Sequence, residues 1–277
     1  MPIVHHPFEL NLGPLPITGF GIAVLLAFVI AQIISQHELL RRGYQKEAEA
    51  IPDLILACVI GTLVGGKLYY AGIVMQDWSA LWSRAGFVFW GGFIGSVIAC
   101  WLVIQKKKLD FARFSDVAGI ALAAGYSVGR TGCWAVGDDY GKPWDGPLAV
   151  MFPDGAPPST AGVMNRVFGT PIPEGASPDT VLAVHPTQLY ETALGFLMFI
   201  VLWRFRAHRN AEGWLFGMWM VLAGAERFFI EFFRAKDDRL VMGFTLAQVI
   251  AVAIALTGLV IMQLRRRPTA PAVALAG

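Results

Sequence analysis

Charged side chains are scarce in this chain: Asp, Glu, Lys and Arg make up 15% of its 277 residues, against about 25% in a typical soluble domain. Apolar residues reach 56%, and the mean hydropathy is +0.56. The net charge of +2 is small, and no basic cluster is interleaved with aromatic residues, which argues against nucleic acid binding. This composition indicates an integral membrane protein.

Cysteine is scarce as well, with three copies in the chain. Cys58, Cys100 and Cys133 are scattered through apolar surroundings, and they form neither a disulfide framework nor a zinc-ligand spacing. We expect Cys58 and Cys100 to be small buried apolar residues. The opening stretch "MPIVHHPFELNLG" lacks the basic start and apolar run of a secretory signal peptide. No internal repeat is present, and no boundary indicates a second domain.

Seven segments are apolar enough, over about 20 residues, to cross a bilayer as helices. They are residues 17–36, 53–75, 86–105, 115–136, 187–204, 213–233 and 244–264. The long connection over residues 137–186 is rich in Pro and Gly, which predicts an irregular loop with a short strand near Leu148–Phe152. The sequence therefore predicts an all-α fold, a polytopic membrane helical bundle. We expect a single transmembrane domain over residues 1–264 and a basic, disordered tail over residues 265–277.

The distribution of basic residues predicts the orientation of this bundle. The connections that follow the first, third, fifth and seventh segments contain 13 of the 22 Lys and Arg residues. The other connections contain six. Cytoplasmic connections are enriched in Lys and Arg. We therefore expect the N-terminus outside, the C-terminus in the cytoplasm, and the long loop over residues 137–186 on the external side.

Three basic residues, Lys67, Arg130 and Arg227, fall inside predicted spans. A charge at the bilayer centre costs at least about 2.5–3.5 kcal/mol, so such residues usually face a polar interior or a ligand. All three lie about 9–12 Å from the outer ends of their helices, at 1.5 Å per residue. One shared anion, a phospholipid phosphate, would account for them. The alternative is internal pairing, of Arg227 with a neighbouring glutamate and of Arg130 with an aspartate of the following loop.

Further polar residues lie near the same outer ends of the predicted spans. Glu231 follows Arg227 by one helical turn and shares its face. Asp138 and Asp139 follow the fourth span. The stretch "VHPTQLYE" opens the fifth span with His185, Gln188, Tyr190 and Glu191. We expect His185 to be a cap or loop contact more readily than a base, and Tyr190 to be an interfacial anchor.

The stretch "VGRTGCWAVGDDYG" places Gly129, Arg130, Gly132, Gly137 and Gly141 in register with a signature of one enzyme family. Other similar stretches follow in the same order as in that family: "LGPLPITGFG", "GGKLYY", "FWGGFIG", "HPTQLYE" and "ERFFIEFFR". Over nearly its whole length the chain resembles the prolipoprotein diacylglyceryl transferases, which lipidate lipoprotein precursors in the bacterial inner membrane.

The resemblance implies a multi-pass protein of the bacterial inner (cytoplasmic) membrane and a specific reaction. Phosphatidylglycerol donates its diacylglyceryl group to the lipobox cysteine thiol of a preprolipoprotein, a thioether forms, and glycerol phosphate leaves. The reaction needs no cofactor, metal or nucleotide. Arg130 and Arg227 match the essential arginines of the family, which suits phosphate binding. Asp138 and Glu231 match its acidic positions and are expected to be catalytic with them.

The chain departs from the family pattern at four positions. Trp90 replaces a histidine, Cys133 and Val136 replace asparagines, and Phe20 replaces a tyrosine. The residues expected to bind substrate are Lys67, Trp90, Cys133, Gly141, His185, Gln188, Tyr190 and Phe20.

Three hypotheses stay open. The chain is a diverged transferase in which Asp138, Asp139, His185 or another group moves the proton. Alternatively, it is a paralogue with another acceptor that uses Cys133 as a nucleophile beside Arg130. The third hypothesis is a non-catalytic membrane protein that binds or transports lipid. For Cys133 itself, filling a gap in a helix is favoured over nucleophilic chemistry.

Overall fold

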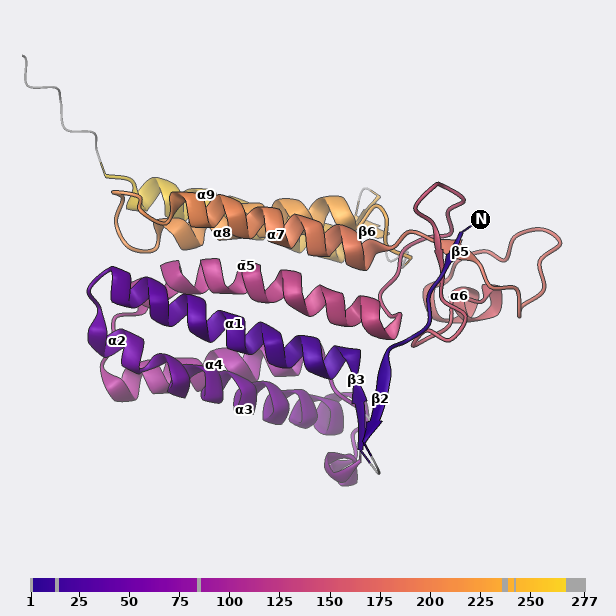
Figure 1. Cartoon of the computed structure of the whole chain (residues 1–277), viewed down its shortest axis with the longest axis horizontal. Helices are drawn as coiled ribbons and strands as arrows, with labels where there is room; N and C mark the ends of the chain where they lie inside the picture. Colours follow the sequence, from indigo (N-terminus) through magenta and orange to yellow (C-terminus); the bar gives the residue numbers. More distant parts are fainter. Residues whose placement is uncertain (1, 13–14, 84–85, 236–238, 242, 268–277) are drawn as a thin grey trace, which may run out of the picture. The chain divides into compact units, whose positions relative to one another are not determined.

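A computed structural model describes residues 2–12, 15–83, 86–235, 239–241 and 243–267. The described chain is mostly helical (Figure 1). Four helical segments are long and apolar enough to cross a membrane: α1 (Gly19–Arg41), Ile51–Val74, α4 (Phe89–Lys107) and α9 (Leu246–Arg265). The second of them consists of α3 (Ile51–Tyr69) and the π-helical turn η1 (Tyr70–Val74). The helices have the character of a membrane protein, in agreement with the sequence.

The remaining predicted spans coincide with α5 (Phe111–Val136), α7 (Thr187–Phe205) and α8 (Trp214–Ile230). Three shorter helices were not expected: α2 (Gln45–Glu49), η2 (Trp78–Trp82) and α6 (Ala161–Phe168). Helix α6 lies inside the loop predicted as irregular, where Thr160 caps it by accepting from the Val163 amide. The expected tail from residue 268 lies outside the described residues.

The chain divides into two compact units, of which the second comprises residues Gln32–Val117. Its helices α3 and α4 pack through glycines, which let helix backbones approach closely. A Cβ atom at Gly65 would collide with the carbonyl oxygen of Gly91, and one at Gly61 would collide with that of Gly95. At the other end of this unit the fully buried carboxylate of Glu38 accepts hydrogen bonds from Arg41 and Arg42.

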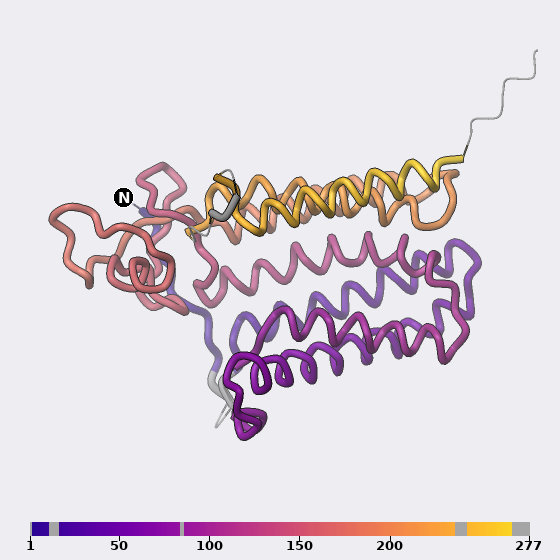
Figure 2. Tube along the Cα trace, turned by 180° about the vertical axis from the view of Figure 1, so that it is seen from behind, coloured from indigo at the N-terminus to yellow at the C-terminus, as the bar shows by residue number. Residues whose placement is uncertain are grey.

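The first unit comprises residues Met1–Ala31 and Ala118–Gly277. In it α7 contacts α8 and α8 contacts α9, and the three helices run side by side in both views (Figures 1 and 2). Helices α8 and α9 approach closely because glycines face each other: a Cβ atom at Gly217 would lie 2.8 Å from the carbonyl oxygen of Gly258. The same unit contains the residues of the candidate site described below.

Short strands add to the helices, so the all-α prediction holds for the spans but not for the segments outside them. β1 (Ile3–Val4) pairs in parallel with β4 (Val150–Met151), which pairs antiparallel with β5 (Ala183–Val184). Strand β4 lies within the predicted Leu148–Phe152. Two further antiparallel pairs are β2 (Glu9–Leu12) with β3 (Leu15–Thr18) and β6 (Arg239–Val241) with β7 (Phe244–Thr245). The sequence signal misses such two- to four-residue strands because alternation needs more residues to be visible.

A small apolar core holds this strand region beside the end of α5. Its buried residues are Tyr140, Val150, Phe152, Met164, Val184 and Ala235. Phe152 is fully buried, stacks on Tyr140 with ring centroids 5.3 Å apart, and meets Trp134 of α5 edge to face. The contact with Trp134 places the segment after α5 at a defined position, which is where the candidate site begins.

Candidate active site at the ends of α5, α7 and α8

Helix α5 ends in a tight turn that directs two aspartates back toward the helix. Gly137 has a left-handed backbone (φ +69°), its amide donates to the Trp134 carbonyl at 3.1 Å, and the Asp138 amide donates to the Cys133 carbonyl at 3.1 Å. This pair of hydrogen bonds is a Schellman motif. Asp139 is also left-handed (φ +54°), a conformation that aspartate tolerates better than most residues. The acids therefore lie beside the last turns of α5.

Arg130, on α5, is the centre of the cluster. Its side chain is 12% exposed. Its Nη2 atom pairs with Glu191 of α7, whose side chain is 3% exposed, and its Nη1 atom donates to Asp139 at 2.9 Å. The same Nη1 atom lies 3.3 Å from the Sγ atom of Cys133. The predicted pairing of Arg130 with an aspartate of the following loop is present, and Glu191 is an additional partner.

Arg234, just beyond α8, shares these carboxylates. Its Nη2 atom donates to the Oδ1 atom of Asp139 at 3.1 Å, and its Nη1 atom lies 3.8 Å from Glu191. Its backbone forms a bridge with Gly141, where a Cβ atom would collide with the carbonyl oxygen of Phe233. Gly141 thus permits the close approach that brings Arg234 and Asp139 together, and no direct substrate contact is needed to explain it.

Arg227 and Glu231 form the α8 part of the cluster. The Nη1 atom of Arg227 lies 2.6 Å from the Oε2 atom of Glu231, but neither atom makes a hydrogen bond within the described residues. The buried Nε atom of Arg130 also lacks a hydrogen-bond partner there. Buried polar atoms are nearly always hydrogen-bonded, and an exception calls for an explanation. Arg130 Nε is therefore available to a ligand, whereas Arg227 Nη1 is already in an ion pair with Glu231.

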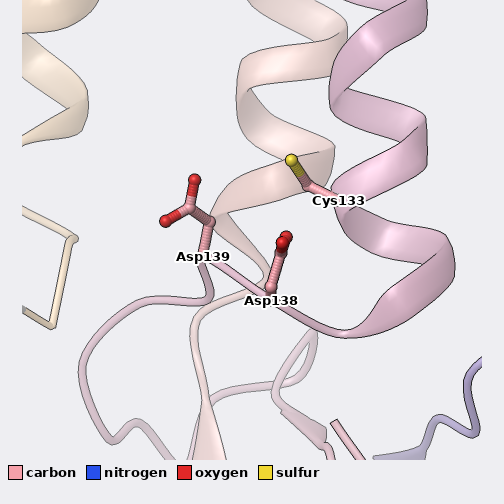
Figure 3. A group of neighbouring side chains, drawn as sticks. All are labelled: Cys133, Asp138 and Asp139. Atoms are coloured by element: carbon pink, nitrogen blue, oxygen red, sulfur yellow. The ribbon is translucent and has the colours of Figure 1, made fainter. Parts of the chain in front are cut away.

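Cys133, Asp138 and Asp139 form a compact trio, with their ligand atoms within 4.8 Å of one another (Figure 3). Burial, followed by the charge of Asp139, raises the pKa of Asp138 to about 6. The pKa of Asp139 is lowered because Arg234 and Arg130 outweigh the effect of its burial. The guanidinium of Arg130 contacts Cys133 and Asp139 of this trio, so the arrangement fits an arginine site better than a metal site.

The start of α7 supports the turn that contains the two aspartates. The fully buried Gln188 donates from Nε2 to the Asp138 carbonyl at 2.5 Å, and Thr187 donates from Oγ1 to the Asp139 carbonyl at 2.7 Å. Gln188 is expected to bind substrate, and in the structure its side chain holds the backbone of Asp138, one of the two acidic residues of this turn.

His185, Tyr190 and Trp144 form an aromatic group next to this turn. The imidazole of His185 stacks on Trp144 with ring centroids 4.3 Å apart, and its Nδ1 atom lies 3.3 Å from the Tyr190 hydroxyl. Burial, followed by the charge of Lys142, lowers the pKa of His185. The loop contact expected for His185 is present, and a neutral imidazole is favoured at neutral pH.

The structure gives the surroundings of three other residues expected to bind substrate. Phe20 is 43% exposed at the start of α1, beside Gly132 of α5. Lys67 and Trp90 belong to the unit Gln32–Val117. Within it the Nζ atom of Lys67 donates to the Ser83 carbonyl at 2.6 Å, and Trp90 is half exposed beside Phe89 and Phe93.

Neither Glu191 nor Arg234 is predicted from the sequence to belong to the site. Glu191 is expected only as part of the polar opening of its span, and Arg234 directly follows the sixth predicted span. Glu191 could have been predicted because it is a carboxylate inside an apolar segment. Such a carboxylate needs a cationic partner, just as an arginine in a span needs an anion.

The helices and this cluster define a class: a helical membrane protein with a buried arginine–carboxylate site that suits an anionic ligand. The family model described as prolipoprotein diacylglyceryl transferase matches residues 7–264, and the chain belongs to this family. Similar proteins are phosphatidylglycerol–prolipoprotein diacylglyceryl transferases of three bacteria. That of Stenotrophomonas maltophilia is 31% identical over 276 residues, covering 94% of this chain and 92% of its own.

The other two relatives show the same extent of similarity. The protein of Oleidesulfovibrio alaskensis is 30% identical over 269 residues, covering 92% of this chain and 91% of its own. The protein of Bordetella avium is 30% identical over 274 residues, covering 94% of this chain and 95% of its own.

Proposed function

We propose that this protein transfers the diacylglyceryl group of phosphatidylglycerol to the lipobox cysteine of a preprolipoprotein. The thiol sulfur attacks the glycerol carbon that bears the phosphate, the carbon–oxygen bond breaks, and a thioether forms. Glycerol phosphate leaves with the electron pair of the broken bond. The family membership and the names of the relatives support this reaction, and the cluster supplies groups suited to each step.

The observation on which the proposal rests is that Arg130 and Arg227 each have a buried guanidinium nitrogen without a hydrogen bond to the described residues, although that of Arg227 is ion-paired with Glu231. Arg130 Nε and Arg227 Nη1 are buried and lack hydrogen-bond partners among the described residues. Guanidinium groups bind phosphate through fixed, paired N–H donors. A phosphodiester bound there would satisfy both arginines, and the same donors would stabilise the charge that develops on the leaving phosphate.

Asp138 is the best candidate for the base that accepts the thiol proton. Asp139 and Glu191 already accept hydrogen bonds from arginines, whereas the buried Oδ1 atom of Asp138 has no partner in the described part of the chain. Its pKa of about 6 leaves it mostly ionised at neutral pH yet close enough to take up a proton. Asp138 would replace the family histidine that is Trp90 here.

The finer topology belongs to the same proposal. All seven predicted segments would cross the bacterial inner membrane as one transmembrane domain, with the N-terminus and the long loop over residues 137–186 outside. Phosphatidylglycerol and the precursor would then reach the cluster from the outer side. Phe20, Cys133, His185 and Tyr190, which belong to the same unit as the cluster, are proposed to contact substrate, and substrate binding by Lys67 and Trp90 stays a prediction from the sequence.

The test is a transfer assay with the purified protein. The protein is mixed with phosphatidylglycerol vesicles and a lipobox peptide, and the peptide mass is measured. We expect the mass of a diacylglyceryl adduct with wild-type protein, and no adduct with Arg130→Ala or Arg227→Ala. The matched control is Arg166→Ala, at an exposed position of α6, which should keep full activity. Absence of the adduct with wild-type protein, or full activity in both cluster variants, would contradict the proposal.

A further inference from the structure

A second carboxyl group lies deeper along the same helices than the arginine cluster. Glu226 precedes Arg227 on α8, and its Oε1 atom accepts a hydrogen bond of 3.1 Å from the Tyr126 hydroxyl of α5. Tyr126 is one helical turn before Arg130. Electrostatic interactions also link Glu226 with Glu191, Arg227 and Arg130. Glu226 therefore borders the proposed phosphate site on the side away from the loop.

The position of Tyr126 is fixed by α7. A Cβ atom at Gly195 would lie 2.9 Å from the Cδ1 atom of Tyr126, so the glycine leaves room for the ring. Beside it, the Ser127 hydroxyl donates to the Thr192 carbonyl at 2.8 Å and ties α5 to α7. The Tyr126 hydroxyl is thus held against Glu226 by packing and is well placed as a permanent donor.

The arginines of the cluster already have carboxylate partners other than Glu226. Arg130, Arg227 and Arg234 are paired with Asp139, Glu191 and Glu231. Glu226 makes no ion pair within the described residues, and its hydrogen bond comes from a neutral hydroxyl. An unpaired carboxylate inside an apolar span is costly, and such a group keeps its proton instead. An added phosphodiester anion would increase that cost for an ionised Glu226.

We propose that Glu226 is a neutral carboxylic acid that accepts a hydrogen bond from Tyr126 and donates its own O–H to the phosphate held by Arg130 and Arg227. This inference rests on the proposed function of the cluster. A neutral donor suits this place because it binds the anion without adding to the charges already paired. Glu226 would then be a lipid-binding residue rather than a base.

The first experiment is infrared spectroscopy, which does not depend on turnover. A protonated carboxyl group gives a C=O stretching band that a carboxylate lacks. We expect such a band in the wild-type protein at neutral pH, and we expect Glu226→Gln to remove it. Addition of phosphatidylglycerol vesicles should shift the band. Glu174→Gln, at an exposed loop position, is the matched control and should leave the band unchanged. A spectrum that Glu226→Gln does not alter would overturn the proposal.

The second experiment compares the kinetics of three variants. Glutamine is neutral and has N–H donors, so Glu226→Gln should keep the KM for phosphatidylglycerol within about threefold. Glu226→Ala should raise that KM by about tenfold or more, the usual effect of losing a hydrogen bond to a charged group. Tyr126→Phe should raise it less. Equal losses in the Gln and Ala variants would show that an ionised carboxylate is required, and no loss in either would show that Glu226 binds no lipid.

The two experiments separate the inference from the proposed function. If the wild-type protein transfers no lipid, the infrared band still reports whether Glu226 is protonated. If transfer occurs but the band is absent, the cluster works without a neutral donor at Glu226. Thermal unfolding of each variant checks that a higher KM does not come from loss of the fold.

Discussion

The Nη2 atom of Arg234 lies 3.1 Å from the Oδ1 atom of Asp139, and this contact joins the segment after α8 to the turn after α5. The other oxygen of Asp139 accepts from Arg130 at 2.9 Å. One carboxylate thus orients two arginines that belong to different helices. The geometry of the proposed phosphate site depends on it.

Replacing Asp139 by asparagine should therefore lower transfer strongly. Each charge-assisted hydrogen bond contributes about 1.5–3 kcal/mol, so we expect kcat/KM to fall by about tenfold to a hundredfold. The control is Asp154→Asn, which removes the exposed contact of 2.8 Å with His6 and should change little. Equal activity in the two variants would show that Asp139 does not organise the arginines.

The pH dependence should report the ionisation of Asp138. Because the base must be ionised, kcat/KM should rise with pH, with a midpoint near the pKa of about 6. Burial and then the charge of Asp139 raise this pKa, whereas Cys133, Arg130 and Arg234 lower it. Asp138→Asn should lose most activity together with this midpoint, and Asp138→Glu should retain a midpoint. A profile of Asp138→Asn that still rises through pH 6 would assign the ionisation to another group.

The same raised pKa of Asp138 affects stability in the opposite direction: stability should fall as the pH rises, whereas kcat/KM should increase. The folded protein holds the proton of Asp138 more tightly than the unfolded chain, whose aspartate pKa is about 3.9. Asp138 therefore contributes most to the free energy of unfolding at pH values below the pKa of the unfolded chain. This contribution is lost as the pH rises through the folded-state pKa of about 6. Thermal unfolding of Asp138→Asn should accordingly show a smaller decline between pH 5 and pH 7 than the wild type.

Substitutions of Cys133 distinguish a structural role from a chemical one. Cys133 is buried, and its sulfur lies 3.3 Å from Arg130 Nη1. An oxygen acceptor can replace that contact, so Cys133→Ser and Cys133→Asn should keep transfer within about tenfold, or ~1.4 kcal/mol. Loss of activity in both variants, with the fold intact by thermal unfolding, would indicate that the thiol itself reacts.

Gly141 should tolerate no side chain. A Cβ atom there would collide with the Phe233 carbonyl and lie 2.8 Å from both His185 and Thr187. Gly141→Ala should therefore lower the melting temperature and the activity, because Arg234 would move away from Asp139. Gly129→Ala is the matched control for stability, since a Cβ atom at Gly129 would meet nothing within 4 Å. A melting temperature lowered equally by both changes would mean that loss of glycine alone is responsible.

Much of the helical framework could be predicted because apolar runs are a strong signal over 20 residues. Arg130 and Arg227 could be singled out from the sequence because charged residues are rare within such apolar runs. Glu231 follows from its spacing to Arg227, and Asp138 follows from the family resemblance. The short strands and α6 were not predicted as such, because they are fixed by contacts such as Phe152 on Tyr140 rather than by local pattern.

Pairing of Arg130 with a loop aspartate and of Arg227 with a neighbouring glutamate could be expected from the sequence, but the other partners within the site could not. Arg130 meets Glu191 only because α5 and α7 pack together, and nothing in the local sequence fixes that register. Asp139 reaches two arginines because Gly137 and Asp139 itself adopt left-handed backbones. For Gln188 the residue type indicated a polar role, but only the structure shows that its amide holds the Asp138 carbonyl.

The hydrogen bonds at the two ends of the long loop have a consequence for how the protein can vary. Gly141 donates to the His185 carbonyl at 2.8 Å, His185 donates to Lys142 at 3.0 Å, and Trp144 donates to Ala183 at 2.9 Å. Both ends of the loop are thereby fastened to each other beside the cluster. Within that loop, the exposed residues 171–175 lie outside the core around Phe152 and can lengthen, shorten or change their sequence while Asp139 and Arg234 keep their separation. Selection for new protein acceptors can act on that segment without disturbing the groups that handle the lipid.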